Sequence, residues 1–465
     1  MGVLALELND AGLVSSAGEG WRDEGPGYAL LDPDRLLLGA EARAQARLRP
    51  RRLVTRFWAR LDTAPLLQAT AYAGSNADLA CAQLDAIWRR RLGGTDWLLP
   101  VIPGGFDRDA LELLLGVTAE LDIPVRGLVD AAVAATLRLA PGRELAHLDF
   151  SLHGALLTRI AQGDALERAE SVVLPEAGLL VLEDAWARAA AGAFVAQTRF
   201  DPLHAAESEQ ALYDRLPGWL AALHEVDEVP VELPLNGAPL AATLARAPLV
   251  AVAGHAYRAL AAELERWRRP GASLVLQLSH RALALPELAR FLAEQPGIEI
   301  LALPPEAAVA GALARLDALP ASSADGPRFV TRLPALGDLP PAPGPGATGM
   351  GAAGATAAAP ETQPTHLLYG AEALPIGPAG LAIGTAPPRD RPALPLPGTP
   401  AGVSRLHCVV RRDEHGVVVE DLSRFGSFVN DERVDGRRVL AAGDQLRLGS
   451  PGVVLQLIRV QPDNA

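Results

Sequence analysis

The sequence contains no lysine, so all 42 of its basic residues are arginine. Chemistry that depends on a lysine amine is therefore excluded. Cysteine is almost as scarce, with Cys81 and Cys408 as the two in the chain. A single pair so far apart in sequence does not make a disulfide framework, and this usage fits a reducing compartment.

Long apolar runs are also missing. No uninterrupted stretch reaches the roughly 18 residues that a membrane-spanning helix needs. The opening segment MGVLALELND lacks the basic region and cleavage site of a signal peptide. We therefore expect a cytoplasmic protein without a membrane partner.

Excess positive charge is absent as well. The formal net charge is −13, and from His366 onward 11 Arg balance 11 Asp plus Glu, so the acidic excess lies upstream. A nucleic-acid partner is not expected, because no basic stretch is available to neutralise a phosphate backbone.

Residues 334–365 stand apart in composition. Pro, Gly, Ala and Thr dominate this run. Such a segment buries too little apolar surface to offset the entropy of ordering it, so we predict a flexible linker between residues 1–333 and residues 366–465. The alternative is a long ordered surface loop within one domain, although loops of this length are uncommon in compact folds.

Residues 1–333 combine an opening hairpin at 3–14 with alternating strands and helices. Expected strands at 97–102, 123–129 and 145–150 are separated by helices that Asp107 and Asp130 are placed to cap, the second of them spanning 131–139. The alternation returns at 273–316 after a helical region. This pattern predicts a bilobal α/β fold.

Three segments of this part resemble the seventy-kilodalton heat-shock chaperones. They are GAEA at 39–42 with Gln45 and Pro50, VIPGGF at 101–106 with DAAVAA at 130–135, and PPEAAVAGA at 304–312. The resemblance implies an actin-like ATPase fold that binds nucleotide between two lobes, with ATP and Mg²⁺ as cofactors.

The nucleotide-contacting motifs of that family are poorly matched. The family's D-L-G-T-T reads ELNDA at 7–11, its D-x-G-G-G-T reads DFSLHG at 149–154, and its G-G-x-x-x-x-P reads SHRALALP at 279–286. The corresponding nucleotide-binding residues are Glu7, Asp149 and Ser279. Acidic and bulky side chains replace the glycines that let phosphate approach the backbone, which predicts a pseudo-ATPase.

Two alternatives remain open for these carboxylates. Glu7 and Asp149 can hold Mg²⁺ through water, or they can be strand-end acids that face solvent. The alternative function is an active, divergent chaperone-type ATPase with an ATP-dependent conformational output, in which Arg56 or Arg60 replaces the family's lysine. No catalytic residue and no dedicated metal site is predicted.

Downstream of the linker, short β-prone runs alternate with Gly, Asp and Pro turns. They are 381–383, 406–411, 417–420, 427–429, 445–448 and 453–459. This spacing predicts an all-β sandwich whose loops carry recognition.

The turns of this part resemble the forkhead-associated (FHA) domain. The matching motifs are SRLH at 404–407, VEDLSRFGSFVN at 419–430 and GDQLRLG at 443–449. The resemblance implies that a threonine-phosphorylated protein or peptide binds the loops.

A phosphate dianion needs charge-assisted donors, which Arg405 and Arg424 supply, with the Ser404 hydroxyl as a third. His407 is expected to point inward. The predicted phosphopeptide-binding residues are Ser404, Arg405, Arg424, Ser427 and Asn430, and the predicted structural residues of the site are Gly384, His407 and Gly426. For the turn residues the alternative is turn chemistry alone.

Two positions depart from the FHA pattern. Thr385 follows Gly384 where the family has a phosphate-binding arginine, and Phe425 replaces an asparagine that binds peptide backbone. Losing one bidentate arginine removes about 1.5–3 kcal/mol of binding free energy. The sequence thus favours a phosphothreonine-dependent adaptor, and leaves open a protein-interaction module that does not need phosphate.

Overall fold

The structure is a computed structural model, and it describes residues 2–18, 21–91, 93–234, 239–269, 271–320, 326–339, 364–369, 372–388, 391–396, 402–413, 416–430, 432–434, 436–449 and 453–459. The chain folds into two compact units, residues 1–342 and 343–465. Within the described parts of the chain, none of the helices combines the length and the apolar character that a membrane crossing requires.

The first sheet of the N-terminal unit has the strand order β16-β8-β7-β1-β2-β3. Its strands are β1 (Gly2–Glu7), β2 (Leu13–Gly18), β3 (Trp21–Gly25), β7 (Thr95–Ile102), β8 (Leu128–Asp130) and β16 (Phe329–Val330). β1, β2 and β3 form an antiparallel meander, and β7, β8 and β16 continue the sheet in parallel from β1.

The second sheet repeats this arrangement, with the order β15-β14-β9-β10-β11-β17. Its strands are β9 (Glu144–Phe150), β10 (Ala155–Gln162), β11 (Leu166–Leu174), β14 (Leu274–Leu278), β15 (Ile298–Ala302) and β17 (Arg332–Leu333). Again an antiparallel meander, β9-β10-β11, is extended in parallel from its first strand by β14 and β15.

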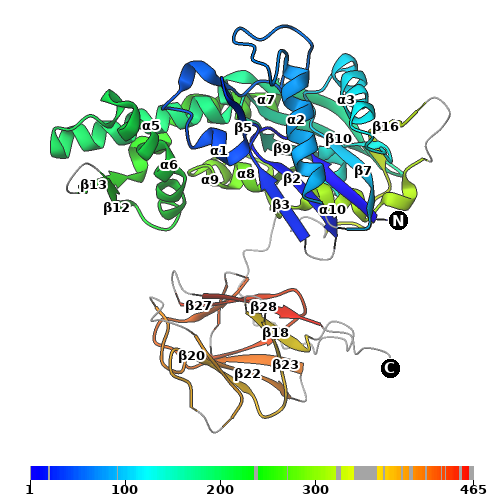
Figure 1. The fold of residues 1–465 in the computed structure, drawn as a ribbon. Helices are drawn as coiled ribbons and strands as arrows, with labels where there is room; N and C mark the ends of the chain where they lie inside the picture. The colour runs from blue at the N-terminus through cyan, green and yellow to red at the C-terminus, as the bar shows by residue number, and fades with distance from the viewer. Residues whose placement is uncertain are drawn as a thin grey trace. The chain divides into compact units, whose positions relative to one another are not determined.

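Helices cover both faces of each sheet (Figure 1), because the central strands are apolar on both sides. The short helices α4 (Ala131–Ala135) and α10 (Ala307–Leu313) lie in a core shared by both sheets. α2 (Asn76–Arg89) and α3 (Arg108–Glu120) pack on the first sheet. We call the first sheet with α2 and α3 the first lobe.

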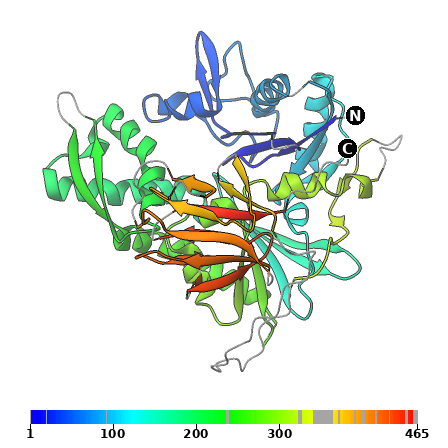
Figure 2. The same cartoon turned by 90° about the horizontal axis from the view of Figure 1, so that it is seen from below.

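The second lobe is the second sheet with the helices that pack on it. These helices are α5 (Leu179–Thr198), α6 (Ala206–Ala222), α7 (Arg246–Trp267), α8 (His280–Leu283) and α9 (Leu288–Ala293). α5, α6 and the hairpin of β12 (Glu228–Leu233) and β13 (Leu240–Ala245) gather at one end of the unit (Figure 2).

The remaining elements of this unit are short. They are β4 (Ala29–Asp32), β5 (Arg35–Leu38), β6 (Leu53–Val54), α1 (Gly39–Arg43), and the 3₁₀ helices η1 (Pro50–Arg52), η2 (Pro175–Ala177), η3 (Pro202–His204) and η4 (Leu316–Ala318).

Several local predictions are confirmed. β1 and β2 pair as the expected hairpin, and β7 and β9 contain the expected strands at 97–102 and 145–150. Asp107 accepts a hydrogen bond from Ala110 N at 2.9 Å, and Asp130 accepts one from Val133 N at 3.0 Å, so both cap their helices.

Two predicted elements are too long. The strand expected at 123–129 is reduced to β8, and the helix expected at 131–139 ends at Ala135. The Thr136 hydroxyl lies 2.7 Å from both the Ala132 carbonyl and Gln277 Oε1, and the residues after it pair with a distant segment of the chain. Tertiary contacts override the alanine-rich helix propensity there.

That distant segment is the first part of the predicted linker. Leu336 N donates to Leu137 O at 2.7 Å and Leu339 N donates to Leu139 O at 2.6 Å, so residues 334–339 belong to the fold of the N-terminal unit. Residues 340–363 lie outside the described residues, and the domain limits 1–333, 334–365 and 366–465 stay a prediction.

The C-terminal unit is a sandwich of two sheets, as predicted. One sheet has the order β19-β18-β28-β27-β24-β25 and the other β21-β20-β22-β23-β26. The strands are β18 (His366–Tyr369), β19 (Glu372–Pro375), β20 (Leu381–Gly384), β21 (Ala393–Pro395), β22 (Cys408–Asp413), β23 (Gly416–Asp421), β24 (Ser427–Val429), β25 (Glu432–Arg433), β26 (Arg437–Leu440), β27 (Gln445–Leu448) and β28 (Val453–Ile458). The inward side chains of both sheets form one apolar core.

Candidate functional site

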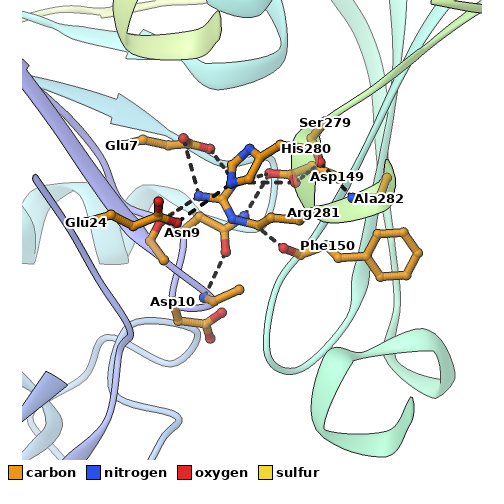
Figure 3. A network of polar contacts seen from close by, with 12 residues as sticks. Glu7, Asn9, Asp10, Glu24, Asp149, Phe150, Ser279, His280, Arg281 and Ala282 are labelled. Atoms are coloured by element: carbon orange, nitrogen blue, oxygen red, sulfur yellow. Dashed lines mark hydrogen bonds and ion pairs between the residues drawn. The ribbon is translucent and has the colours of Figure 1, made fainter. Parts of the chain in front are cut away.

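Two carboxylates, one from each sheet, meet a buried arginine between the lobes of the N-terminal unit. Glu7 ends β1, Asp149 lies near the end of β9, and Arg281 belongs to α8. Arg281 Nη1 lies 3.1 Å from Glu7 Oε1 and 3.1 Å from Asp149 Oδ2, and Nη2 donates to the Gly12 carbonyl at 2.6 Å. Figure 3 shows the guanidinium between the two acids. We call Glu7, Asp149 and Arg281 the interlobe triad.

Neighbouring polar groups complete this network. Ser279 caps α8 through Ala282 N at 3.2 Å, and its hydroxyl also donates to Asp149. Asn9 Nδ2 donates to Asp149 Oδ2 at 2.7 Å and to the Phe150 carbonyl at 3.0 Å. The structure thus brings the three predicted nucleotide-binding residues, Glu7, Asp149 and Ser279, into one place, where Arg281 binds both acids and Ser279 binds Asp149.

The charges of the triad are mutually dependent. All three side chains are at least nine-tenths buried. Burial would raise the pKa of Asp149, but Arg281 and His147, with hydrogen bonds from Ser279 and the backbone, together hold the carboxyl below its ordinary pKa. Burial raises the pKa of Glu7 despite Arg281. Burial opposes the charge on Arg281, but Glu7 and Asp149 together raise its pKa. The guanidinium therefore stays charged, and it compensates the two buried acids.

ATP with Mg²⁺ does not fit this arrangement. The carboxylate oxygens that would face the metal bind Arg281 instead, and the cavity lined by Glu7, Asp149, Ser279 and Arg281 has a volume of only about 20 Å³. Such a space holds about one water molecule, whereas sites for drug-sized ligands span roughly 300–1,000 Å³. The alternative of strand-end acids facing solvent is wrong, because both acids are buried.

Asp10 lies on the turn that follows Asn9, beside a separate cavity of about 250 Å³ lined also by Trp58 and Phe106. Asp10 Oδ1 accepts a hydrogen bond from Leu152 N at 2.7 Å, while Oδ2 has no partner among the described residues. Burial raises the pKa of Asp10 to about 6. The same described parts of the chain contain no group of three His, Cys, Asp or Glu residues placed to hold a metal ion.

Three of the five predicted phosphopeptide residues lie on two loops of the C-terminal unit, beside a third loop that begins at Gly384. Ser404 and Arg405 precede β22, Arg424 lies between β23 and β24, and Gly384 ends β20. Arg424 N donates to Ser404 Oγ at 3.2 Å, which joins two of the loops. A Cβ on Gly384 would lie 2.3 Å from the Arg405 carbonyl oxygen, so the third loop approaches closely only because residue 384 is glycine.

His407 connects the same loops from inside. It is fully buried, its Nδ1 accepts from Ser404 N at 3.1 Å, and its Nε2 donates to the Gly426 carbonyl at 3.1 Å. Burial lowers its pKa, so the ring stays neutral. Gly426 has a φ of 88°, which favours glycine. His407 and Gly426 therefore hold the loops in place.

Two of the predicted binding residues are occupied within the fold. The Ser427 hydroxyl is buried and donates to Asp421 Oδ1 at 2.8 Å. Asn430 donates to Asp444 Oδ1 at 2.8 Å and accepts from Gln445 N at 2.9 Å. These bonds give both residues a role in the turns, which is the alternative that the sequence left open for Asn430, and their placement among the binding residues stays a prediction.

Comparison with known families identifies this module. Residues 383–449 match the family model of the FHA domain. The matched stretch runs from β20 to the end of β27 and contains all three loops. FHA domains bind phosphothreonine-containing peptides, so the C-terminal unit carries a module of a kind that recognises phosphoproteins. A search of curated proteins found no match to the chain.

Three exposed arginines of the FHA domain lack a charge partner among the described residues, and the sequence analysis missed one of them. Arg405, Arg424 and Arg433 have no ion pair or side-chain hydrogen bond with any residue that the structure describes. Arg433 of β25 lies against the turn at Gly426, where a Cβ would be 3.0 Å from its Nε. Its signal in the sequence is its position, three residues after the motif that ends at Asn430.

Both departures from the FHA pattern lie on these loops. Thr385 N donates to the Ser404 carbonyl at 3.1 Å, so this position supports the loop through its backbone. Phe425 is 51% exposed, and its ring lies 5.9 Å from Arg424 Cζ. The FHA domain therefore has a cationic loop surface with an aromatic ring beside it.

Proposed function

We propose that the chain is a phosphothreonine-dependent adaptor, in which the FHA domain binds a threonine-phosphorylated partner protein. The observation that carries this proposal is that two joined loops of a domain matching the FHA family carry the Ser404 hydroxyl and the exposed side chains of Arg405 and Arg424, which pair with no described residue.

The loop geometry suits a phosphate dianion. Ser404 Oγ already accepts a hydrogen bond from Arg424 N, so the hydroxyl hydrogen is available to donate to a phosphate oxygen. Arg405 and Arg424 are exposed and add charge-assisted donors. No described carboxylate pairs with either guanidinium, so an incoming phosphate displaces no internal ion pair.

For the N-terminal unit, the proposal is a divergent actin-like ATPase fold that serves as a scaffold without hydrolysing ATP. The repeated sheet order in the two lobes supports the fold, since each lobe contains a three-stranded meander extended in parallel from its first strand. The interlobe triad and the cavity of about 20 Å³ beside it support the loss of turnover.

Peptide binding tests the FHA part. Matched phosphothreonine and unphosphorylated peptide libraries are passed over the immobilised full chain, its Ser404→Ala variant and its Arg424→Ala variant. Wild type should retain only phosphorylated peptides, and each substitution should weaken retention about tenfold or more. Equal retention of phosphorylated and unphosphorylated peptides by the wild type would show that the loops do not recognise phosphate.

Nucleotide binding tests the scaffold part. Titration of the full chain with Mg·ATP in a calorimeter should give no binding heat, and an assay for phosphate release should give no turnover. Turnover that is lost on Asp149→Ala would instead establish the active ATPase.

A further inference from the structure

An uncharged loop of the N-terminal unit carries large apolar side chains into solvent. Residues 63–75, which lead into α2 at the outer edge of the unit (Figure 1), contain no charged residue. Leu67 is fully exposed, so its side chain packs against nothing, and Tyr72 is 49% exposed. Single exposed apolar residues are ordinary, but a whole loop without charge that presents two of them indicates a contact surface.

Hydrogen bonds support this loop although its side chains are exposed. Thr70 N donates to the Ala73 carbonyl at 3.0 Å, which closes a turn within the loop. The Tyr72 hydroxyl donates to the Asp34 carbonyl in the turn between β4 and β5. Leu67 is therefore presented on a supported backbone, so burying its side chain elsewhere requires little further ordering of the loop.

Arginines lie on the turn that the loop contacts and on the segment beside it. Arg35 directly follows Asp34 and is exposed, and its side chain has no ion pair or hydrogen bond with any residue that the structure describes. Arg49 pairs with Asp32 at the start of the same turn, which brings η1 alongside. Arg51 of η1 is exposed and likewise unpaired with the described residues. The uncharged loop therefore has exposed positive charge next to it.

The charge of this region is opposite to that of the whole chain. Residues 32–62 contain eight arginines and four acids, whereas the formal net charge of the chain is −13. A complementary surface is therefore anionic around a point that accepts apolar side chains. Two large side chains give far less area than the about 800 Å² that each partner contributes to a standard protein interface. A bilayer with anionic lipid needs no such area, because each nearby arginine adds attraction to the lipid charge.

We propose that residues 63–75 form a contact site for anionic membranes, with Leu67 among the lipid chains, Tyr72 at the level of the headgroups, and Arg35 and Arg51 against lipid phosphates. Tyrosine suits the membrane interface because its ring is apolar and its hydroxyl is polar. The expectation of no membrane partner was based on the absence of a spanning segment, and a peripheral contact needs none. The proposed adaptor then brings its partner protein to a membrane surface.

Sedimentation with lipid vesicles tests the proposal on the full chain. Vesicles of phosphatidylcholine with phosphatidylserine are compared with vesicles of phosphatidylcholine alone, each at low and at high salt. Wild type should bind the anionic vesicles about tenfold or more tightly than the neutral ones, and high salt should remove this difference. Leu67→Ser should weaken binding to the anionic vesicles about tenfold or more, and Arg35→Ser and Arg51→Ser should each weaken it about fivefold.

A matched control is Val252→Ser, which removes an exposed aliphatic side chain from α7. It should bind vesicles like wild type. No binding of wild type to the anionic vesicles, or equal binding by wild type and Leu67→Ser, would overturn the membrane site. Self-association of the chain that Leu67→Ser abolishes, without binding to vesicles, would also overturn it and would make the loop a contact between copies. Phosphopeptide binding should be the same in all these variants, so the proposed function is tested separately.

Discussion

Removing the cation of the interlobe triad should destabilise the N-terminal unit strongly. Arg281→Met leaves Glu7 and Asp149 buried on opposite sides of the cleft without a compensating charge. Breaking a buried ion pair by removing one partner costs about 3–5 kcal/mol of unfolding free energy, because an uncompensated charge stays behind. A loss of this size is a large part of the unfolding free energy of an ordinary domain.

The loss should depend on pH. Without Arg281 the pKa values of Glu7 and Asp149 in the folded state rise above those in the unfolded state. The variant is therefore relatively stable at a pH below the unfolded-state pKa values. As the pH increases above them, its unfolding free energy falls by up to about 1.4 kcal/mol per pH unit for each acid. Urea unfolding followed by tryptophan fluorescence measures this in the full chain, since all seven tryptophans precede residue 268 and report on the N-terminal unit alone.

Two further variants make the test specific. Arg108→Met removes an exposed arginine that pairs with Glu112 on α3, and it should change the unfolding free energy by no more than about 0.5 kcal/mol. Combining Arg281→Met with Glu7→Gln and Asp149→Asn should recover most of the loss, because no charge remains to be buried. A deficit below about 1 kcal/mol for Arg281→Met, or one that does not vary with pH, would refute this account.

Three other substitutions have expected outcomes. Burial raises the pKa of Asp10 to about 6, so Asp10→Asn should stabilise the protein by about 1–3 kcal/mol above pH 6 and by nothing near pH 4. Thermal unfolding measures this, and a stability difference between variant and wild type that does not change with pH would contradict it. Gly384→Ala should lower the unfolding free energy by about 1–3 kcal/mol and weaken phosphopeptide binding, since the added methyl group would clash with the Arg405 carbonyl. A variant that matches wild type in urea unfolding and in peptide-binding anisotropy would contradict this. Thr385→Arg restores the family's arginine and should raise phosphopeptide affinity about ten- to a hundredfold in the same anisotropy assay, unless this loop lies away from the phosphate.

Local patterns were enough to predict much of the fold. Apolar runs and capping aspartates located the hairpin of β1 and β2, the strand β7 and the start of α3, because these features depend on neighbouring residues. The end of α4 could not be predicted in the same way. It depends on the contact of Thr136 with Gln277, which lies 141 residues away in sequence.

For the site as well, local motifs predicted some features, and contacts between distant residues determined the others. The motifs predicted that Glu7, Asp149 and Ser279 would meet, but they did not indicate that Arg281 fills the space between them. Its side chain is set by ion pairs to residues 274 and 132 positions away. Likewise the motif at 419–430 identified the loop of Arg424, while the inward direction of Ser427 follows from its bond to Asp421.

The interlobe triad also restricts which substitutions this sequence can accept during evolution. Replacing Arg281 alone leaves two buried carboxylates without their cation, whereas replacing one carboxylate still leaves an ion pair, so a lineage that loses Arg281 first carries a weakened fold. Homologous chains that keep both carboxylates should therefore also keep the arginine. Pairwise covariation of positions 7, 149 and 281 among such chains would record this constraint.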